Sequence, residues 1–141
     1  MVPEASRRRR SIVATLFAAI VLVVSQFARA ADVERGQSLY TARCGACHSI
    51  TDNGAGPRHA QLFGRKAGTQ PGFDYSPALR AAALHWNART LDRWISNPSA
   101  LVPGNKMVVQ LANDPRDRAD IIAYLQTATS PMPPAHEETP H

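Results

Sequence analysis

The clearest pattern of apolar and polar positions lies in the last third of the chain. Asp114 suits the N-cap of a helix, and Pro115 suits its first position, because a first-turn amide has no partner within the helix. The apolar positions that follow recur at helical spacing and form one stripe: Ile121, Ile122 and Leu125. We therefore predict a helix that begins after Asp114 and buries this stripe.

Three further helices are predicted from capping residues and apolar spacing. Their ranges are 32–47, 76–83 and 90–96. The first has Asp32 as its N-cap and Glu34 in its first turn, and should end near the cysteines. The third has Thr90 as its N-cap and stops at Asn97-Pro98, because proline disfavours helix in the preceding residue.

Long segments between these helices have neither helical nor strand periodicity. Residues 49–75 are dense in glycine, proline and asparagine, and a second loop, 99–106, contains Pro103-Gly104. A loop of this length counts against a compact domain unless something inside the domain organises it. Residues 130–141 are rich in proline and are expected to be a disordered tail. We find no internal repeat and predict an all-α fold.

The first 30 residues have the order of a secretory signal peptide. A basic run, Arg7 to Arg10, precedes an apolar run from Ile12 to Val24, and small residues surround a cleavage site after Ala30. An uncleaved membrane anchor is the alternative, although a span needs about 20 apolar residues. A mitochondrial transit peptide fits less well, because those segments are amphipathic.

Cleavage after Ala30 changes the charge of the chain. The formal net charge of +5 falls to +1, since the remaining chain has 11 basic and 10 acidic side chains. The basic character of the precursor therefore belongs to its targeting segment and gives no support to nucleic-acid binding, which needs a basic patch on the folded domain. The domain, 31–129, is long enough for one modest core, which a large buried cofactor would extend.

The two cysteines stand in Cys44-Gly45-Ala46-Cys47-His48, the spacing that attaches c-type haem. Each thiol can bond to the porphyrin, and the next imidazole can bind the iron. A redox C-x-x-C site would require a βαβ context, and a zinc site would require a second pair of ligands. A disulfide across two residues would be strained and would close almost no loop.

Met107 is the candidate for the sixth iron ligand. Met1 leaves with the signal peptide, Met132 lies in the proline-rich tail, and Met107 follows the stiff Pro103-Gly104 pair. The alternative is a methionine that fills a gap in the core. His/Met ligation raises the reduction potential, and a full coordination sphere keeps oxygen from the iron. His59 and His85 are alternative ligands, but we interpret both as solvated surface residues.

Taken together, these motifs resemble the mitochondrial-type class I cytochromes c and their bacterial relatives. The resemblance runs from Asp32 to Thr129 and rests on Gly36, Tyr40, Cys44-x-x-Cys47-His48, Gly56-Pro57, 62–66, 71–75, Trp86, Asn97-Pro98, 103–107 and 122–125. It implies a cytochrome c fold, in which crossing N- and C-terminal helices, short helices and long loops surround one covalent haem. His48 and Met107 would hold the iron.

The resemblance also implies roles for other residues. The carbonyl of Pro57 would accept a hydrogen bond from His48 and fix its ring. Three side chains would hold the inner haem propionate: Arg65, Tyr75 and Trp86. Gly36 would let the first helix cross the last one closely, near Tyr40 and Tyr124.

The chain departs from the family at positions that would affect the reduction potential of the haem and the attraction of redox partners. Trp94 replaces a tyrosine beside the methionine, Asn105 replaces a threonine and Val109 replaces an aromatic residue. Lys66 and Lys106 are the only lysines of the chain. Four arginines could supply part of a positive face: Arg43, Arg58, Arg80 and Arg93. Steering of partners by charge should therefore be modest.

We interpret the protein as a monomeric periplasmic one-electron carrier, not an enzyme. Its expected partners are a membrane quinol-oxidising complex, a terminal oxidase or a periplasmic dehydrogenase, and it would contact a membrane only if residues 1–30 stay attached. One alternative is a dedicated cytochrome subunit of a periplasmic dehydrogenase or oxidase. The other is a haem peroxidase or sensor, which would need an open position on the iron.

Overall fold

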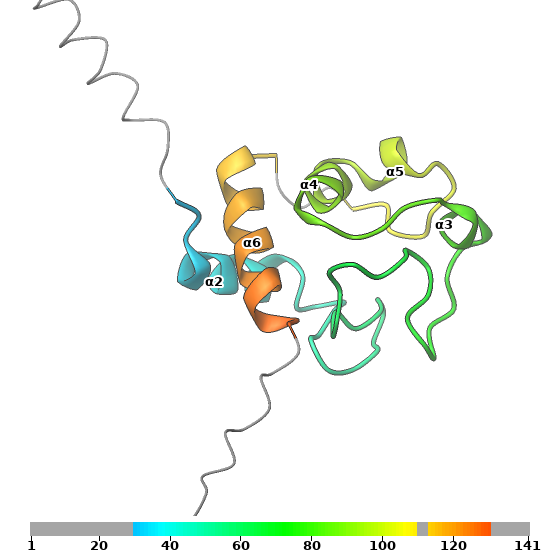
Figure 1. Cartoon of the computed structure of the whole chain (residues 1–141), viewed down its shortest axis with the longest axis horizontal. Helices are drawn as coiled ribbons and strands as arrows, with labels where there is room; N and C mark the ends of the chain where they lie inside the picture. The colour runs from blue at the N-terminus through cyan, green and yellow to red at the C-terminus, as the bar shows by residue number, and fades with distance from the viewer. Residues whose placement is uncertain (1–29, 110–112, 131–141) are drawn as a thin grey trace, which may run out of the picture. The chain divides into compact units, whose positions relative to one another are not determined.

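The computed structural model describes residues 30–109 and 113–130 of the chain (Figure 1). Their helices are α2 (Val33–Arg43), α3 (Pro77–Ala81), α4 (Ala88–Ser96), α5 (Pro98–Leu101) and α6 (Pro115–Ala128). Within these residues there is no strand, and the only β-type pairing is an isolated bridge between Lys66 and His85. The predicted all-α fold is confirmed. The predicted signal peptide and tail lie outside the described residues, except for residues 30 and 130.

The two terminal helices begin as their sequences predict. The Asp32 side chain accepts a hydrogen bond from the amide of Arg35 at 2.9 Å and caps α2. Asp114 caps α6 in the same way, accepting from the amide of Arg116 at 2.8 Å, with Pro115 in first position. The apolar stripe of α6 is buried as predicted.

α2 and α6 cross at a glycine, and this crossing joins the two ends of the domain (Figure 1). Gly36 of α2 lies against the backbone of Asp120 in α6. Beside this contact the rings of Tyr40 and Tyr124 lie 5.3 Å apart, centroid to centroid. The crossing expected from the resemblance is therefore present, and it places the end of α2, where the cysteines follow, against the core.

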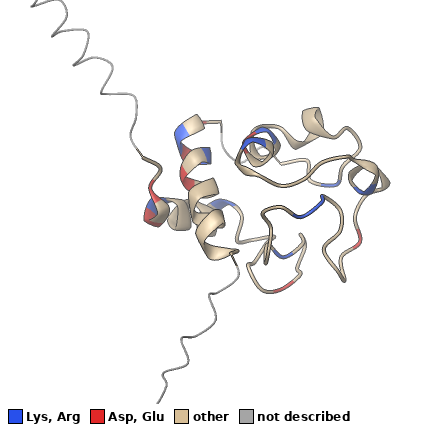
Figure 2. Ribbon diagram, viewed as in Figure 1, with Lys and Arg blue, Asp and Glu red and all other residues tan. Residues whose placement is uncertain are grey.

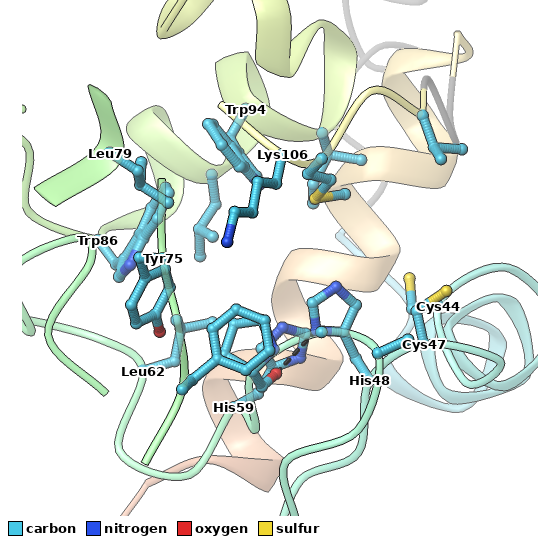
Figure 3. A pocket seen from close by; sticks show the side chains of 18 of the residues that line it. Cys44, Cys47, His48, His59, Leu62, Tyr75, Leu79, Trp86, Trp94 and Lys106 are labelled. Atoms are coloured by element: carbon cyan, nitrogen blue, oxygen red, sulfur yellow. Dashed lines mark hydrogen bonds between the residues drawn. The ribbon is translucent and has the colours of Figure 1, made fainter. Parts of the chain in front are cut away.

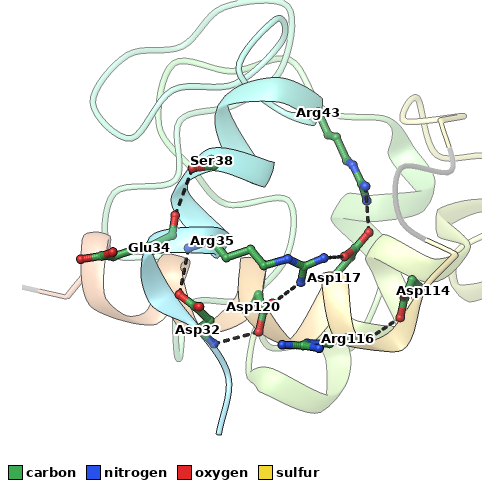
Figure 4. Close-up of polar contacts among 9 residues, drawn as sticks. All are labelled: Asp32, Glu34, Arg35, Ser38, Arg43, Asp114, Arg116, Asp117 and Asp120. Atoms are coloured by element: carbon green, nitrogen blue, oxygen red, sulfur yellow. Dashed lines mark hydrogen bonds and ion pairs between the residues drawn. The ribbon is translucent and has the colours of Figure 1, made fainter. Parts of the chain in front are cut away.

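Charged side chains reinforce the crossing from its outer side (Figure 4). Arg35 forms ion pairs with both Asp117 and Asp120, and Arg43 pairs with Asp117 at 2.8 Å. Asp120 also accepts a hydrogen bond from the amide of Asp32 at 2.8 Å. Only 7% of Asp117 and 1% of Asp120 is exposed, so these carboxylates need their partners.

The shorter helices differ from the prediction at their ends. α4 begins at Ala88 and not at Thr90, because Asn87 is its N-cap and Thr90 completes a reciprocal capping box three residues later. Pro98 does not simply end a helix. It opens α5, since a proline suits the first position of a helix, and the predicted loop 99–106 is therefore shorter. α3 is also shorter than predicted, with Ser76 as N-cap.

The long loop 49–75 is ordered by hydrogen bonds between its parts. The side chain of Asn53 accepts from the amide of Arg58 at 2.9 Å and donates to the carbonyl of Pro71 at 3.1 Å. Residues of this loop thereby line one side of the interior. In the two described ranges, no helix has the length and apolar character that crossing a membrane requires.

Candidate functional site

The eight residues predicted to hold a haem or its iron all line one cavity, which Figure 3 shows from close by. The cavity has a volume of about 230 Å³ and lies between the long loop, α4, α6 and the segment after α5. The eight are Cys44, Cys47, His48, Pro57, Arg65, Tyr75, Trp86 and Met107. Most other lining residues are apolar, which suits a large hydrophobic ligand with a few polar groups.

The end of α2 carries the two thiols to the cavity. After Arg43 the chain turns, and the amides of Cys47 and His48 both donate to the carbonyl of Cys44 at 3.0 and 2.9 Å. Cys44 is buried and Cys47 is exposed, and neither forms a disulfide. Burial raises the pKa of the Cys44 thiol to about 11, so this thiol is protonated at neutral pH.

The imidazole of His48 is held in one tautomer. Its Nδ1 lies 2.7 Å from the carbonyl oxygen of Pro57. Because a carbonyl oxygen only accepts, Nδ1 carries the hydrogen, and Nε2 keeps a lone pair free for a metal. Burial lowers the pKa of His48 despite the opposing effect of the Pro57 bond, which favours the neutral ring that metals bind.

Gly56 gives the His48 ring its space. A β-carbon on residue 56 would stand 2.3 Å from Cε1 of His48 and 2.7 Å from Nε2. Any other residue would therefore have to displace the ring or the loop. Gly56 and Pro57 act as a pair, because the first leaves room for the imidazole and the second fixes its Nδ1.

His59 corrects one of our predictions. It is not a solvated surface residue: it lines the cavity and stacks on His48, with ring centroids 4.4 Å apart and planes at 21°. Its Nδ1 lies 3.1 Å from the hydroxyl of Tyr40. Burial, followed by the charges of His48 and Arg65, lowers the pKa of His59 to about 3. His85 is exposed as predicted.

Trp86 and Arg65 both line the cavity, and Figure 3 shows Trp86 across it from the cysteines. Their backbones pair, since the amide of Trp86 donates to the carbonyl of Arg65 at 2.9 Å. The Trp86 ring packs edge-on against Trp94 at 5.4 Å. The guanidinium of Arg65 donates to the carbonyl of Ala60 at 2.5 Å and to the side chain of Gln70. These bonds fix a cation at the wall of an apolar cavity.

The segment after α5 brings Met107 to the cavity. Gly104 adopts a positive φ of 81°, and Asn105 closes the turn by donating from its side chain to the carbonyl of Val102 at 2.8 Å. Lys106 then pairs with Asp74 at 2.7 Å. Met107 is half-buried, and the next two residues, Val108 and Val109, are 74% and 49% exposed.

Sequence reasoning missed two features of the site. Nothing in the polar segment around His59 indicated burial, because its partners come from α2 and from the cysteine motif. Gln70, the partner of Arg65, is 5% exposed and gave no signal of its own. Conversely, Asn105 does not line the cavity, although Trp94 and Val109 do.

The cavity fits a covalently attached haem better than a bare metal ion. Two free thiols, an imidazole with its metal-binding nitrogen available and a methionine share one apolar cavity with a fixed arginine. Among the described residues, no three His, Cys, Asp or Glu side chains come together as a metal cluster would require. The chemistry of this donor set is that of a porphyrin iron.

Comparison with known proteins also indicates a haem protein. The family model for cytochrome c matches residues 33–129. Cytochrome c2 of Rhodomicrobium vannielii is 41% identical over 118 residues, covering 82% of this chain and 93% of that protein. Cytochrome c of Chlamydomonas reinhardtii is 42% identical over 106 residues, covering 73% and 95%. The structure of cytochrome cH from Methylobacterium extorquens matches with a TM-score of 0.65 at 40% identity, covering 68% of this chain and 98% of that chain.

Proposed function

The chain belongs to the cytochrome c family, and on that premise we propose that it carries single electrons on an iron held by His48 and Met107. The family cofactor is a covalent haem c, for which this chain has two cysteines. When bound, haem c supplies a one-electron iron couple buried in protein. The protein is an electron carrier and not an enzyme.

The tautomer of His48 is the observation that carries this proposal. The Pro57 carbonyl holds the hydrogen on Nδ1, so that Nε2 is the nitrogen left to bind iron. Gly56 leaves the ring its space, and the neighbouring thiols would form the two covalent links. Residues 44–57 thus supply attachment, one axial ligand and the group that orients this ligand.

Met107 is proposed as the second axial ligand. Its side chain lines the same cavity as His48 and follows a turn that Gly104 and Asn105 fix. A core methionine would serve only to fill a gap, whereas this one stands between a lysine tied to the opposite loop and two exposed valines. A thioether ligand would favour the reduced iron and would leave no position open for a substrate.

Arg65, Tyr75 and Trp86 are proposed to hold a haem propionate. All three line the cavity, and Arg65 brings a fixed positive charge to it. A buried carboxylate needs a cation and hydrogen-bond donors to offset its loss of hydration. The phenol and the indole supply such donors. These three residues would therefore orient the haem and also neutralise the charge of its propionate.

We further propose that residues 1–30 export the protein and that residues 31–129 form the carrier in the periplasm. Its partners would be membrane or periplasmic redox proteins. Figure 2 shows basic and acidic residues interspersed along α2 and α6. Two cations, Lys106 and Arg80, are paired with Asp74. This mixture supports modest steering by charge.

An optical comparison of two methionine variants tests the ligation. The haem-loaded protein is examined in its ferric form for the weak near-infrared band that marks sulfur ligation, and in its ferrous form for carbon monoxide binding. Met107→Ala should lose the band and bind carbon monoxide. Met132→Ala, the matched control from outside the described residues, should behave as wild type. A wild-type protein that lacks the band and binds carbon monoxide readily would overturn the carrier proposal in favour of an open haem site.

A further inference from the structure

We propose that His59 is a positioning residue that fixes the plane of the His48 imidazole in the assembled protein. The inference rests on the proposed function, because it takes His48 to be an iron ligand. His59 itself is assigned no bond to the iron. Its role is to limit rotation of the ligand ring and so to set how the imidazole orbitals meet those of the metal.

The rings of His48 and His59 lie close together and nearly parallel. Figure 3 shows His48 and His59 side by side, with ring centroids 4.4 Å apart and planes that differ by 21°. Tyr40, in contrast, meets His59 edge-on at 64°. The torsion that turns an imidazole about its Cβ–Cγ bond has a broad energy minimum, so neighbours determine the ring plane. Pro57 restrains the Nδ1 corner of His48, and the flat face of His59 restrains the ring as a whole.

His59 is itself held from two directions. Its amide donates to the carbonyl of Ser49 at 2.9 Å, which ties its backbone next to His48. Its ring shares a hydrogen bond of 3.1 Å with the hydroxyl of Tyr40, which belongs to α2. A ring that only filled space would not need this bond. The His59 ring is thus held in place, and the His48 ring lies flat against it.

Tyr40 extends this arrangement to the helix crossing. Its ring contacts Tyr124 of α6 with centroids 5.3 Å apart. The sequence of contacts from Tyr124 through Tyr40 and His59 to His48 is therefore continuous. These contacts connect the packing of α2 against α6 with the orientation of the proposed ligand. A change at the crossing would therefore alter the plane of the His48 imidazole.

The test compares two substitutions that differ in shape and not in polarity. In the haem-loaded protein, His59→Phe keeps a flat ring and loses the hydrogen bond to Tyr40, whereas His59→Leu loses the flat ring as well. His85→Leu is the control, since His85 is exposed. The readouts are the electron paramagnetic resonance g-values of the ferric iron and the proton shifts of the haem methyl groups. Both depend on the plane of the axial imidazole.

We expect His59→Leu to change the g-values and the spread of the methyl shifts, and His59→Phe to change them less. Tyr40→Phe, which removes only the hydroxyl, should change them in the direction of His59→Leu. If His59→Leu gives the same spectra as His85→Leu, with reduced stability alone, His59 is only a core residue and the inference is wrong. Equal changes in the Leu and Phe variants would also contradict it.

Failure of the inference can be told apart from failure of the proposed function. His48→Ala removes the proposed ligand itself. If the wild-type spectra show an imidazole ligand that His48→Ala abolishes, the ligation stands whatever His59→Leu does. If His48→Ala leaves the ligand signature intact, another residue binds the iron, and the proposed function fails before the question of ring position arises.

Discussion

Gly36 of α2 lies so close to Asp120 of α6 that a β-carbon on residue 36 would stand 2.0 Å from the Asp120 carbonyl oxygen. That oxygen belongs to the backbone of a helix and cannot move alone. We expect Gly36→Ala to push the helices apart and to reduce the free energy of unfolding by about 3 kcal/mol or more. Denaturant unfolding of the haem-loaded protein measures this, with Gln37→Ala, an exposed position of the same helix, as control. Equal stability of the two variants would contradict the crossing.

Gly56→Ala should act on the proposed iron ligand, His48, more than on the fold. The new β-carbon would meet the ring of His48, whose Nδ1 is tied to Pro57. We expect the ring to turn, the reduction potential to shift and the ferric spectrum to change. Redox titration measures the shift. Gly54→Ala is the matched control, because its nearest neighbour would lie at 3.3 Å and the imidazole would be untouched. A shift of equal size in both variants would count against the role of Gly56.

The ion pairs at the α2–α6 crossing should make stability fall in acid. Hydrogen bonds from Arg43 and Arg35 lower the pKa of Asp117 below the ordinary value of 3.8. The unfolded chain therefore binds a proton here more readily than the folded chain does. The stabilisation is complete above about pH 4 and is lost as the pH falls through the lower, folded value.

Unfolding curves measured from pH 6 downwards test this prediction. Asp117→Asn should be less stable at neutral pH and should lose less further stability on acidification than wild type. Glu34→Gln removes the same charge from an exposed position of α2 and controls for net charge. An Asp117→Asn protein with the acid profile of the wild type would show that this carboxylate does not contribute.

The ion pair between Lys106 and Asp74 should contribute little to stability. Both side chains are mostly exposed, 58% and 80%, so water and salt screen the pair. We expect Asp74→Asn to lower the melting temperature only slightly, and by less again at about 1 M salt. Thermal unfolding at two ionic strengths checks this. A large loss that persists in high salt would mean that the contact holds the Met107 segment in place.

The sequence predicts well those features that depend on neighbouring residues, such as helix caps. Asp32 and Asp114 cap α2 and α6, because the signals for a helix start lie within one turn of the cap. The start of α4 was missed because Asn87 and Thr90 are both good N-caps, and only the folded geometry shows that they bond to each other. The sequence likewise predicts Pro98 to be a helix stop, although it both follows α4 and opens α5.

In the site, too, local features were predictable and features that depend on tertiary contacts were not. The haem-attachment motif is contiguous and could be identified from five residues, and the resemblance supplied the residues far from it. The partial burial of His59 could not be predicted, because it depends on Tyr40, 19 positions earlier, and on the path of the loop that brings it onto His48. The polar residues around it gave the opposite indication. Tertiary contacts outweighed local composition at this position.

The crossing of the first and last helices also imposes an order of events during synthesis. Arg35 and Asp120 are 85 positions apart, so the domain cannot close until α6 has been made. α2 has 11 residues, and a lone helix of that length is barely stable in water. The cysteine motif is therefore made long before α6, the helix that closes the domain, and haem attachment can act on an open chain. A chain truncated before Asp114 would keep the complete attachment motif but would lack α6, whose Ile121 and Leu125 line the cavity.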